Sequence, residues 1–395
     1  MNELDVYVNG VLSGKLYKEH DHSYIFRYVM NEAGAFVSLT MPVRVKDYEY
    51  QVLHPIFQMN LPEGYNLEIL RRKFAKLIEL DDMALLSLVG ANQIGRIAVA
   101  EPGAKPRDEP VLALMDDRLL GTRGAQALLT ALVEEYVPGA GISGVQPKIV
   151  SAHTAKGKVL LQTVSHIYKS STEYPLLSAN EYFCLRACRA AGVAVAETAL
   201  SGDGQVLRIK RFDASADGTR LGFEEAAVLR GLSRHGKYEG SYEKMYSSLL
   251  CFISKLHRRA DSESLFRMIA MNVALRNGDA HLKNFGVIYP SVDEIRLAPA
   301  YDVVTTCVYM PKDLMALSME ESRDWPDVKR LMRFARGPAG LAPARAKAIM
   351  KDCTTGILRT MAEVRRFAAR KPIYRKLAES MCKHWSLGLE SLGHA

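Results

Sequence analysis

Alternating apolar and polar residues open the chain. Residues 4–8 follow this pattern and run into Asn9-Gly10, a dipeptide typical of tight hairpin turns. The pattern therefore predicts a β-hairpin in which residues 11–17 form the returning strand. Two further runs, 23–29 and 35–41, have the same character and are expected to be strands.

The pattern changes to helical spacing after the segment Leu61-Pro62-Glu63-Gly64, which interrupts the strands. Apolar residues then recur at helical intervals over 67–77, which predicts an amphipathic helix. A second helix is expected to begin near Asp81-Asp82, because carboxylates stabilise a helix N-terminus. Residues 101–110 are rich in Pro, Gly and charge and are the best candidate for a linker.

Beyond the linker, β-type segments precede a long helical region. The elements expected up to residue 212 are a helix over roughly 122–136, strands at 149–151 and 159–165 with 166–169 continuing the second strand, a helix from Ser178 to about 191–192, and a strand at 206–212. Residues 223–395 are mostly helical by periodicity, apart from a β-like stretch at 285–300. This order predicts an α+β fold with two lobes.

Composition fits a folded protein with a mildly basic surface. Apolar residues make up 48% of the 395 residues and charged residues 24%, the balance of a globular chain with two or three domains. Lys and Arg number 52 against 44 Asp and Glu. This excess allows a polyanionic partner such as a nucleotide or nucleic acid, and it fits an ordinary basic enzyme surface equally well.

Three features indicate a cytoplasmic protein that makes no use of a membrane. No stretch approaches the roughly 18 consecutive apolar residues of a membrane span. The acidic start lacks the basic and then apolar pattern of a secretory signal. The six cysteines contain no C-x-x-C pair and are too sparse for a disulfide scaffold, so we expect reduced and mostly buried thiols.

Residues 276–284 carry the strongest chemical signal. Within them, Asp279 and Asn284 have the spacing of the kinase catalytic loop, in which the Asp accepts a hydroxyl proton and the Asn binds Mg²⁺. Asp302 closes the following β-like stretch, where a kinase places its second metal-binding Asp. Mg²⁺ prefers oxygen ligands, often one or two protein groups completed by phosphate and water. Asn284 and Asp302 could supply those groups.

Upstream residues extend the kinase pattern. Residues 139–144 fit G-x-G-x-x-G and precede β-type sequence, which favours a hairpin flap over phosphates. Lys169 ends the next strand and Glu181 lies on the following helix, as in the kinase Lys–Glu ion pair. Plain structural roles also exist: Lys169 could be a surface lysine, and Glu181 could be the capping-box partner of Ser178. The joint occurrence in kinase order favours phosphoryl transfer.

The sequence gives less support to other chemistries and to single-residue alternatives. The motifs of zinc proteases, serine hydrolases and Walker-type NTPases are absent. Asp279 alone could be a turn or helix-cap residue, and His281 could be a histidine that only packs the loop. The ordered set of motifs outweighs these alternatives.

At these positions the sequence resembles the HipA family of bacterial serine/threonine kinase toxins. The segments that carry the resemblance are 61–64, 143–148, 166–169, 180–184, 211–213, 277–284 and 301–302. The resemblance implies a two-lobed, protein-kinase-like fold with a small β-rich N-terminal subdomain over 1–105, a kinase N-lobe with the Gly-rich flap over 106–212, and a helical C-lobe over 213–395. It also implies an enzyme that uses ATP and Mg²⁺ to phosphorylate a protein hydroxyl. Family members act on aminoacyl-tRNA synthetases and pair with a helix-turn-helix antitoxin, through which they reach DNA.

Carried over position by position, the resemblance makes Asp279 the proton acceptor and Asn284 and Asp302 the metal ligands. The implied ATP-binding residues are Ser143, Gly144, Val145, Gln146, Lys148, Lys169, Lys210, Arg211, Phe212, His281, Lys283, Asn284, Tyr301 and Asp302. Glu181 is the implied ion-pair partner of Lys169.

Two positions depart from the family pattern. Gly141 stands where the family flap carries a serine that becomes phosphorylated, so autophosphorylation would use Ser143 or be absent. Lys210 stands at a hinge position that often holds an acidic residue. These departures leave a second hypothesis open, a catalytically weak nucleotide-binding corepressor subunit of a DNA-bound toxin–antitoxin complex. A small-molecule kinase is a third reading, because the sequence does not identify the acceptor.

Overall fold

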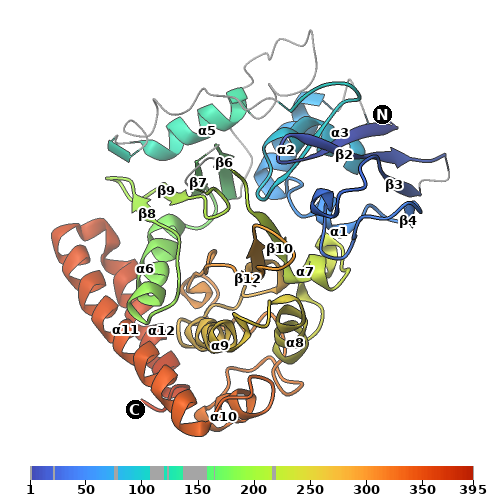
Figure 1. Cartoon of the computed structure of the whole chain (residues 1–395). Coiled ribbons are helices and arrows are strands. Elements are labelled where there is room, and N and C mark those ends of the chain that lie inside the picture. Colours follow the sequence, from blue (N-terminus) through green and yellow to red (C-terminus); the bar gives the residue numbers. More distant parts are fainter. Residues whose placement is uncertain are drawn as a thin grey trace.

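The computed structural model describes residues 2–20, 23–74, 79–106, 120–121, 124–136, 158–163, 165–215 and 219–394. Within these ranges the fold is a mixed α+β arrangement, with antiparallel sheets in the N-terminal half and a mostly helical C-terminal part (Figure 1). The α+β class predicted from the sequence is confirmed. The strand expected at 149–151 and the Gly-rich pattern at 139–144 lie outside the described residues.

The N-terminal sheet contains the predicted hairpin. Its strands lie in the order β4-β3-β2-β1-β5 and comprise β1 (Glu3–Val8), β2 (Val11–Lys18), β3 (Tyr24–Tyr28), β4 (Tyr48–Tyr50) and β5 (Ile97–Ala100). The hairpin turn places Asn9 at φ 47° and Gly10 at φ 78°, the left-handed conformations that this dipeptide adopts at low cost. The helices α1 (Pro55–Gln58), α2 (Gly64–Phe74) and α3 (Asp82–Val89) share one apolar core with the sheet.

Residues 35–41 do not form the strand that their pattern predicted. A short 3-10 helix, η1 (Ala33–Ala35), comes first, and the rest is irregular apart from one isolated bridge. A side chain from another element binds this backbone in place of a neighbouring strand, because the guanidinium of Arg96 donates to the carbonyl oxygen of Phe36 at 2.7 Å. That interaction cannot be read from the local pattern of residues.

The second sheet supplies the strand that leads into the candidate site. It has the order β6-β7-β9-β8 and comprises β6 (Lys158–Gln162), β7 (His166–Ser171), β8 (Thr198–Leu200) and β9 (Leu207–Lys210). The prediction that 166–169 continues the preceding strand is wrong. The chain reverses between the two strands, and β7 runs antiparallel to β6 with Lys169 opposite Leu160. Apolar residues of α5 (Ala125–Tyr136) pack against this sheet.

The predicted helix after β7 is α6 (Leu177–Ala190). Ser178 is not its N-cap, as the sequence suggested. Leu176 takes that position with φ 57°, and the hydroxyl of Ser178 donates instead to the carbonyl oxygen of Gln205 at 2.8 Å. Glu181 is therefore not the second member of a capping box, and its side chain serves another contact.

The C-terminal part is helical around a small third sheet (Figure 1). The sheet has the order β10-β11-β12 and consists of β10 (Gly222–Glu225), β11 (Gly286–Tyr289) and β12 (Arg296–Leu297). The helices are α7 (Ala226–Leu229), α8 (Tyr242–Phe252), α9 (Arg258–Ala274), α10 (Val328–Arg336), α11 (Pro343–Arg370) and α12 (Arg375–Glu390), with 3-10 turns at η4 (Arg234–Tyr238) and η5 (Leu282–Asn284). In the ranges that the structure covers, no helix has both the length and the apolar character to cross a membrane.

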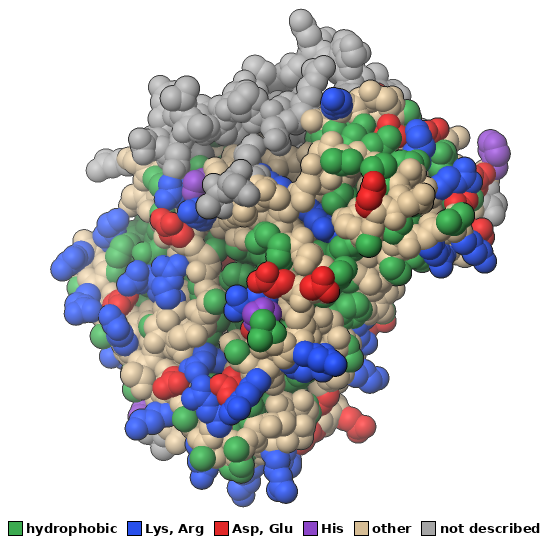
Figure 2. Space-filling model, viewed as in Figure 1, with side chains coloured by type: hydrophobic (Ala, Val, Ile, Leu, Met, Phe, Trp, Pro, Cys, Tyr) green, Lys and Arg blue, Asp and Glu red, His purple; other side chains and the backbone are tan. Residues whose placement is uncertain are grey.

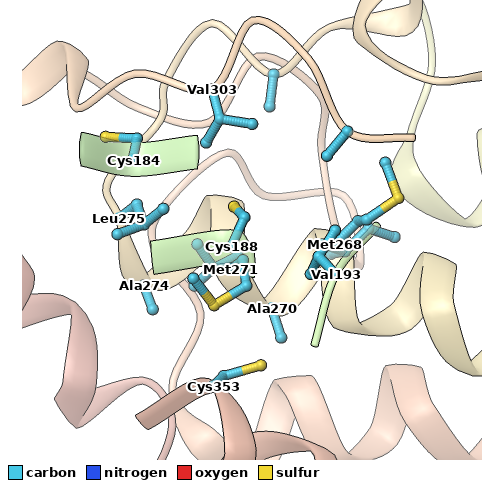
Figure 3. Packing of buried hydrophobic residues seen from close by; sticks show 14 of the residues in the cluster. Cys184, Cys188, Val193, Met268, Ala270, Met271, Ala274, Leu275, Val303 and Cys353 are labelled. Carbon is cyan, nitrogen blue, oxygen red and sulfur yellow. The ribbon is translucent and has the colours of Figure 1, made fainter. Parts of the chain in front are cut away.

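Cysteine and methionine side chains are part of the apolar packing of the helical core. Figure 3 shows Cys188 of α6 and Met271 of α9 near the middle of the labelled residues, with Cys184 of α6 above them and Cys353 of α11 below. All six cysteines are free and five are buried, which confirms the expectation of mostly buried thiols. The long helix α11 approaches α6 closely at Gly356, where a Cβ atom would lie 2.6 Å from the backbone nitrogen of the residue after α6. This packing fixes α6, and with it Glu181, against the C-terminal helices.

Candidate active site

Asp279 lies in a tight loop directly after α9. Arg276 turns the chain with a left-handed backbone conformation (φ 54°), and the side chain of Asn277 accepts the backbone N–H of Asp279 at 3.2 Å. A Cβ on Gly278 would lie 2.5 Å from the carbonyl oxygen of Leu314, so glycine is required at this position. The loop thus holds Asp279 in place while 34% of its side chain remains exposed.

Asn284 and Asp302, the predicted metal ligands, are neighbours in space. Asn284 ends η5, and its Oδ1 accepts the backbone N–H of His281 at 3.2 Å. Its Nδ2 donates to the carbonyl oxygen of Asp302 at 3.4 Å. These contacts bring together two oxygen-bearing side chains from separate segments.

Lys169 connects this loop to α6. Its Nζ donates to Oε1 of Glu181 and to Oδ1 of Asp302, both at 2.8 Å. The exposed fraction is 19% for the Lys169 side chain and 4% for that of Glu181. Burial alone would lower the pKa of Lys169, but the carboxylates of Asp302 and Glu181 outweigh burial and raise it, so the ammonium form is retained. The structure therefore brings together the Lys and Glu that the sequence paired.

Two lysines keep the carboxyl group of Asp302 in its ionised form. Burial would raise the pKa of its carboxyl group, but the ammonium groups of Lys158 and Lys169 outweigh burial and hold this pKa far below its usual range. Asp302 is therefore an anion at physiological pH. Lys158, at the start of β6, was not expected from the sequence, because an exposed lysine at a strand end has no distinguishing mark.

Two aromatic residues lie against Asp279. Tyr238 Oη donates to Oδ1 of Asp279 at 2.8 Å, and Nε2 of His281 lies 3.9 Å from the same oxygen. The rings of Tyr238 and His281 meet edge to face with their centroids 5.1 Å apart. Burial lowers the pKa of His281 to about 4 against the pull of Asp279, so the imidazole is neutral at physiological pH. This position is compatible with both interpretations of His281, as a nucleotide-binding residue and as a residue that only packs the loop.

Aromatic rings form an apolar wall next to Asp302. Tyr301 stacks on Phe212 with ring centroids 5.7 Å apart, and Phe223 packs edge-on against both rings. The hydroxyl of Tyr301 donates to the carbonyl oxygen of Lys283 at 2.8 Å. Flat apolar surfaces of this kind are suited to the base of a nucleotide.

Lys283 reaches the N-terminal part of the chain. Its Nζ donates to Glu63 at 2.9 Å, and Lys237 Nζ lies 3.4 Å from the other oxygen of the same carboxylate. Burial would raise the pKa of Glu63, but Lys283 and Lys237 outweigh it and lower this pKa. Glu63 belongs to the segment 61–64 that the sequence analysis singled out, although no role was assigned to it there.

Arg211, a residue implied as an ATP ligand, makes several contacts within the protein. The guanidinium of Arg211 is fully buried, donates to both carboxylate oxygens of Asp213, and reaches Asn92 at 2.7 Å and the carbonyl oxygen of Gln93. This side chain ties the end of β9 to the N-terminal part. Lys210 is exposed at the end of β9.

The flap residues Ser143, Gly144, Val145, Gln146 and Lys148, together with Gly141, lie outside the described residues.

Figure 2 shows that acidic, basic and histidine side chains gather near the middle of the face seen in Figure 1. The sequence did not single out Tyr238 or Lys158, and it indicated no role for the side chain of Glu63. Each acquires its place only through contacts with distant segments.

Two family definitions cover most of the chain. The HipA N-terminal domain matches residues 4–100, and the HipA-like C-terminal domain matches residues 140–361. The second match alone spans more than half of the chain. The chain belongs to the HipA family.

Curated relatives of this HipA protein carry kinase names. Two are from Sinorhizobium fredii: "Putative kinase Y4dM" is 26% identical over 292 residues, covering 69% of this chain and 67% of the relative, and "Putative kinase Y4mE" is 23% identical over 359 residues, covering 84% and 85%. A chain in the solved structure "Shewanella oneidensis MR-1 Toxin Antitoxin System HipA, HipB and its operator DNA complex" is 18% identical. It has a TM-score of 0.72 and covers 98% of this chain and 96% of that one. The HipA fold therefore extends over nearly the whole chain.

The residues present fit a magnesium ion. An amide oxygen of Asn284 and an ionised carboxylate of Asp302 are hard oxygen donors, the type that Mg²⁺ prefers. Oδ1 of Asp302 is held by Lys169, which leaves its second oxygen for another contact. Two protein groups of this kind suffice where substrate phosphates and water complete the coordination.

Proposed function

We propose that this protein is an ATP- and Mg²⁺-dependent serine/threonine protein kinase of the HipA toxin type. The observation that carries the proposal is the position of Lys169, which pairs with Glu181 and Asp302 at 2.8 Å each. In kinases a lysine paired with a helix glutamate binds the α- and β-phosphates, and a neighbouring aspartate binds the metal. Membership in the HipA family supports the same activity.

The proposed mechanism assigns one task to each group. The partly exposed carboxylate of Asp279 accepts the proton of the acceptor hydroxyl as that oxygen bonds to the γ-phosphorus and the bond to ADP breaks. Lys169 neutralises charge on the phosphates, and the wall of Tyr301 and Phe212 holds the base. Mg²⁺, when bound, would supply positive charge that offsets the negative charge developing on the phosphate oxygens. Asn284 and Asp302 are the residues that would hold it.

Several implied roles are part of this proposal. The flap at 143–148 would cover the phosphates, and Ser143 would be the autophosphorylation site if one exists. His281, Lys283 and the backbone at 210–211 would complete the nucleotide pocket.

Phosphate transfer by purified protein tests the activity. Wild type is incubated with γ-labelled ATP and a generic protein acceptor, with and without Mg²⁺, beside Asp279→Asn. Loss of the proton acceptor should reduce transfer by about 10²- to 10⁴-fold. Asp293→Asn is the matched control, since Asp293 is exposed on the loop between β11 and β12. Equal transfer by wild type and Asp279→Asn would contradict the assignment.

The partners proposed for this protein follow from its relatives. The Shewanella oneidensis structure holds HipA with HipB and operator DNA. We infer a cytoplasmic protein that is neutralised by a small helix-turn-helix antitoxin, contacts DNA through it, and phosphorylates a translation factor such as an aminoacyl-tRNA synthetase. Phosphoproteomics of cells that express wild type or Asp279→Asn would identify the acceptor. The absence of any phosphosite that depends on Asp279 would count against a protein substrate.

A further inference from the structure

The 3-10 turn η4 makes side-chain contacts both with the N-terminal segments around α1–α3 and with the loop that carries Asp279. At its start, the guanidinium of Arg234 donates to Asp82 of α3 at 3.0 Å, and the backbone N–H of Arg234 donates to the side chain of Gln58 at 3.1 Å. One turn later, Lys237 Nζ lies 3.4 Å from Glu63. Three side chains from α1, α3 and the segment before α2 thus hold this short element.

The last residue of η4 is Tyr238, and it faces Asp279. Its hydroxyl donates to Oδ1 of Asp279 at 2.8 Å, while the edge of the neighbouring His281 ring packs against the phenol. The backbone of Tyr238 is also held, because Arg323 donates to its carbonyl oxygen at 3.2 Å. Burial and the carboxylate of Asp279 raise the pKa of the phenol, so it remains a hydrogen-bond donor.

A carboxylate that accepts a proton works best when its orientation is fixed before the reaction. Among the side chains that the structure describes, Tyr238 alone donates a hydrogen bond to Asp279. This bond occupies Oδ1 and leaves Oδ2 for the acceptor hydroxyl. Preorganised geometry of this kind accelerates a reaction because the group need not be oriented during the chemical step.

We propose that Tyr238 is a positioning residue that orients Asp279 for proton abstraction, and that the N-terminal part supports this role through its contacts with η4. The inference rests on the proposed kinase function. It assigns to α1, α3 and Glu63 a task in catalysis that they perform through η4.

The test is Tyr238→Phe in the full chain, which removes only the hydroxyl group. Steady-state phosphorylation should show kcat reduced about 10- to 100-fold, the worth of a hydrogen bond to a charged group, with KM for ATP within about twofold of wild type. Tyr48→Phe is the matched control, because it removes a hydroxyl that bonds to the carbonyl oxygen of Pro42 far from the site. It should leave both constants unchanged.

A second variant tests the support from the N-terminal part, and it keeps the proposal testable if Tyr238→Phe does not fold. Asp82→Asn weakens the ion pair to Arg234 without touching Lys283 or Asp279, and it should lower kcat several-fold at unchanged KM. Asp47→Asn, which removes an ion pair to Arg27 on the first sheet, is its control and should have no effect on kcat.

The outcomes separate this inference from the kinase function. A wild-type protein that transfers no phosphate would overturn the proposed function. An active wild type with unchanged kcat in both Tyr238→Phe and Asp82→Asn would overturn only the positioning role. A higher kcat in Tyr238→Phe would also overturn it, because the phenol would then be competing with the acceptor hydroxyl for Asp279.

Discussion

Nζ of Lys169 lies 2.8 Å from Oδ1 of Asp302, although 133 residues separate them in the chain. The contact joins the second sheet to the loop that follows the third sheet. Because the same amine also holds Glu181 at 2.8 Å, one cation connects a strand, a helix and the loop that carries Asp302. The position of the Asp302 carboxylate therefore depends on a residue of the second sheet.

Replacing Lys169 tests this dependence. Lys169→Met should reduce kcat/KM for phosphate transfer by at least about 100-fold, since charge stabilisation of phosphates and orientation of Asp302 are lost together. The free energy of unfolding should fall by about 1–3 kcal/mol, because Glu181 remains buried without its partner. Kinetics and urea denaturation measure the two effects.

Lys244→Met is the control for loss of a lysine charge, because Lys244 is exposed on α8. It should change neither activity nor stability by a measurable amount. Activity of Lys169→Met within twofold of wild type would show that the amine has no part in catalysis.

Some local features of this chain follow from sequence, because neighbouring residues determine them. The carboxylate of Asp81 caps α3 by accepting the backbone N–H of Ala84 at 2.8 Å, as its position before an apolar run indicated. The Asn9-Gly10 turn is equally local. Ser178 has the spacing of a cap and fails as one, because a carbonyl oxygen from Gln205 offers a better partner.

The same division applies to the candidate site. The family spacing predicted that Asn284 and Asp302 lie close together, and the structure brings them into contact. The side chains of Tyr238 and Glu63 could not be placed, because their contacts with Asp279 and Lys283 join segments that lie 41 and 220 residues apart in the chain. Spacing within one motif contains no information about such contacts.

Arg211 provides a test of a structural role where the resemblance implied a nucleotide contact. Its guanidinium and the carboxylate of Asp213 form a fully buried ion pair, so Arg211→Ala leaves an unpaired buried charge. We expect the free energy of unfolding to fall by about 3–5 kcal/mol in urea titrations. Arg211→Lys should recover only part of this loss, because an ammonium group cannot bind both oxygens in the same plane.

Arg359→Ala is the comparison for Arg211, since its ion pair with Glu363 is 4.0 Å long and Arg359 is 75% exposed. Its effect on stability should stay within about 0.5 kcal/mol. Similar stability of Arg211→Ala and wild type would show that Asp213 is satisfied in some other way.

Phe212 tests the proposed base-binding wall. Phe212→Ala removes the ring that stacks on Tyr301, and loss of one stacking surface should weaken binding of a non-hydrolysable ATP analogue by about 5- to 100-fold. Phe212→Leu retains apolar bulk without a flat ring, and its affinity for the analogue should lie between those of wild type and Phe212→Ala. Calorimetric titration measures the affinities, and equal affinity for all three proteins would exclude the wall as the base site.

Glu225 ends β10 and feels the charge of Lys283, and its ionisation should make the free energy of unfolding depend on pH. Burial raises its pKa to about 8, against the pull of Lys283, while the pKa of an unfolded glutamate is about 4.3. The folded protein therefore binds a proton that the unfolded chain has released. This contribution to stability is complete below about pH 4.3 and is lost as the pH rises toward 8.

Comparison with Glu225→Gln isolates this effect, because a glutamine in the same place stays neutral at every pH. The free energy of unfolding of wild type, measured relative to Glu225→Gln by urea denaturation, should decline between about pH 5 and pH 8 by an amount on the order of a few kcal/mol. Glu101→Gln, at an exposed position, should show no such trend against wild type. Parallel pH curves for wild type and Glu225→Gln would mean that Glu225 is ionised in the folded protein, in which case a cation such as Lys283 must compensate its burial.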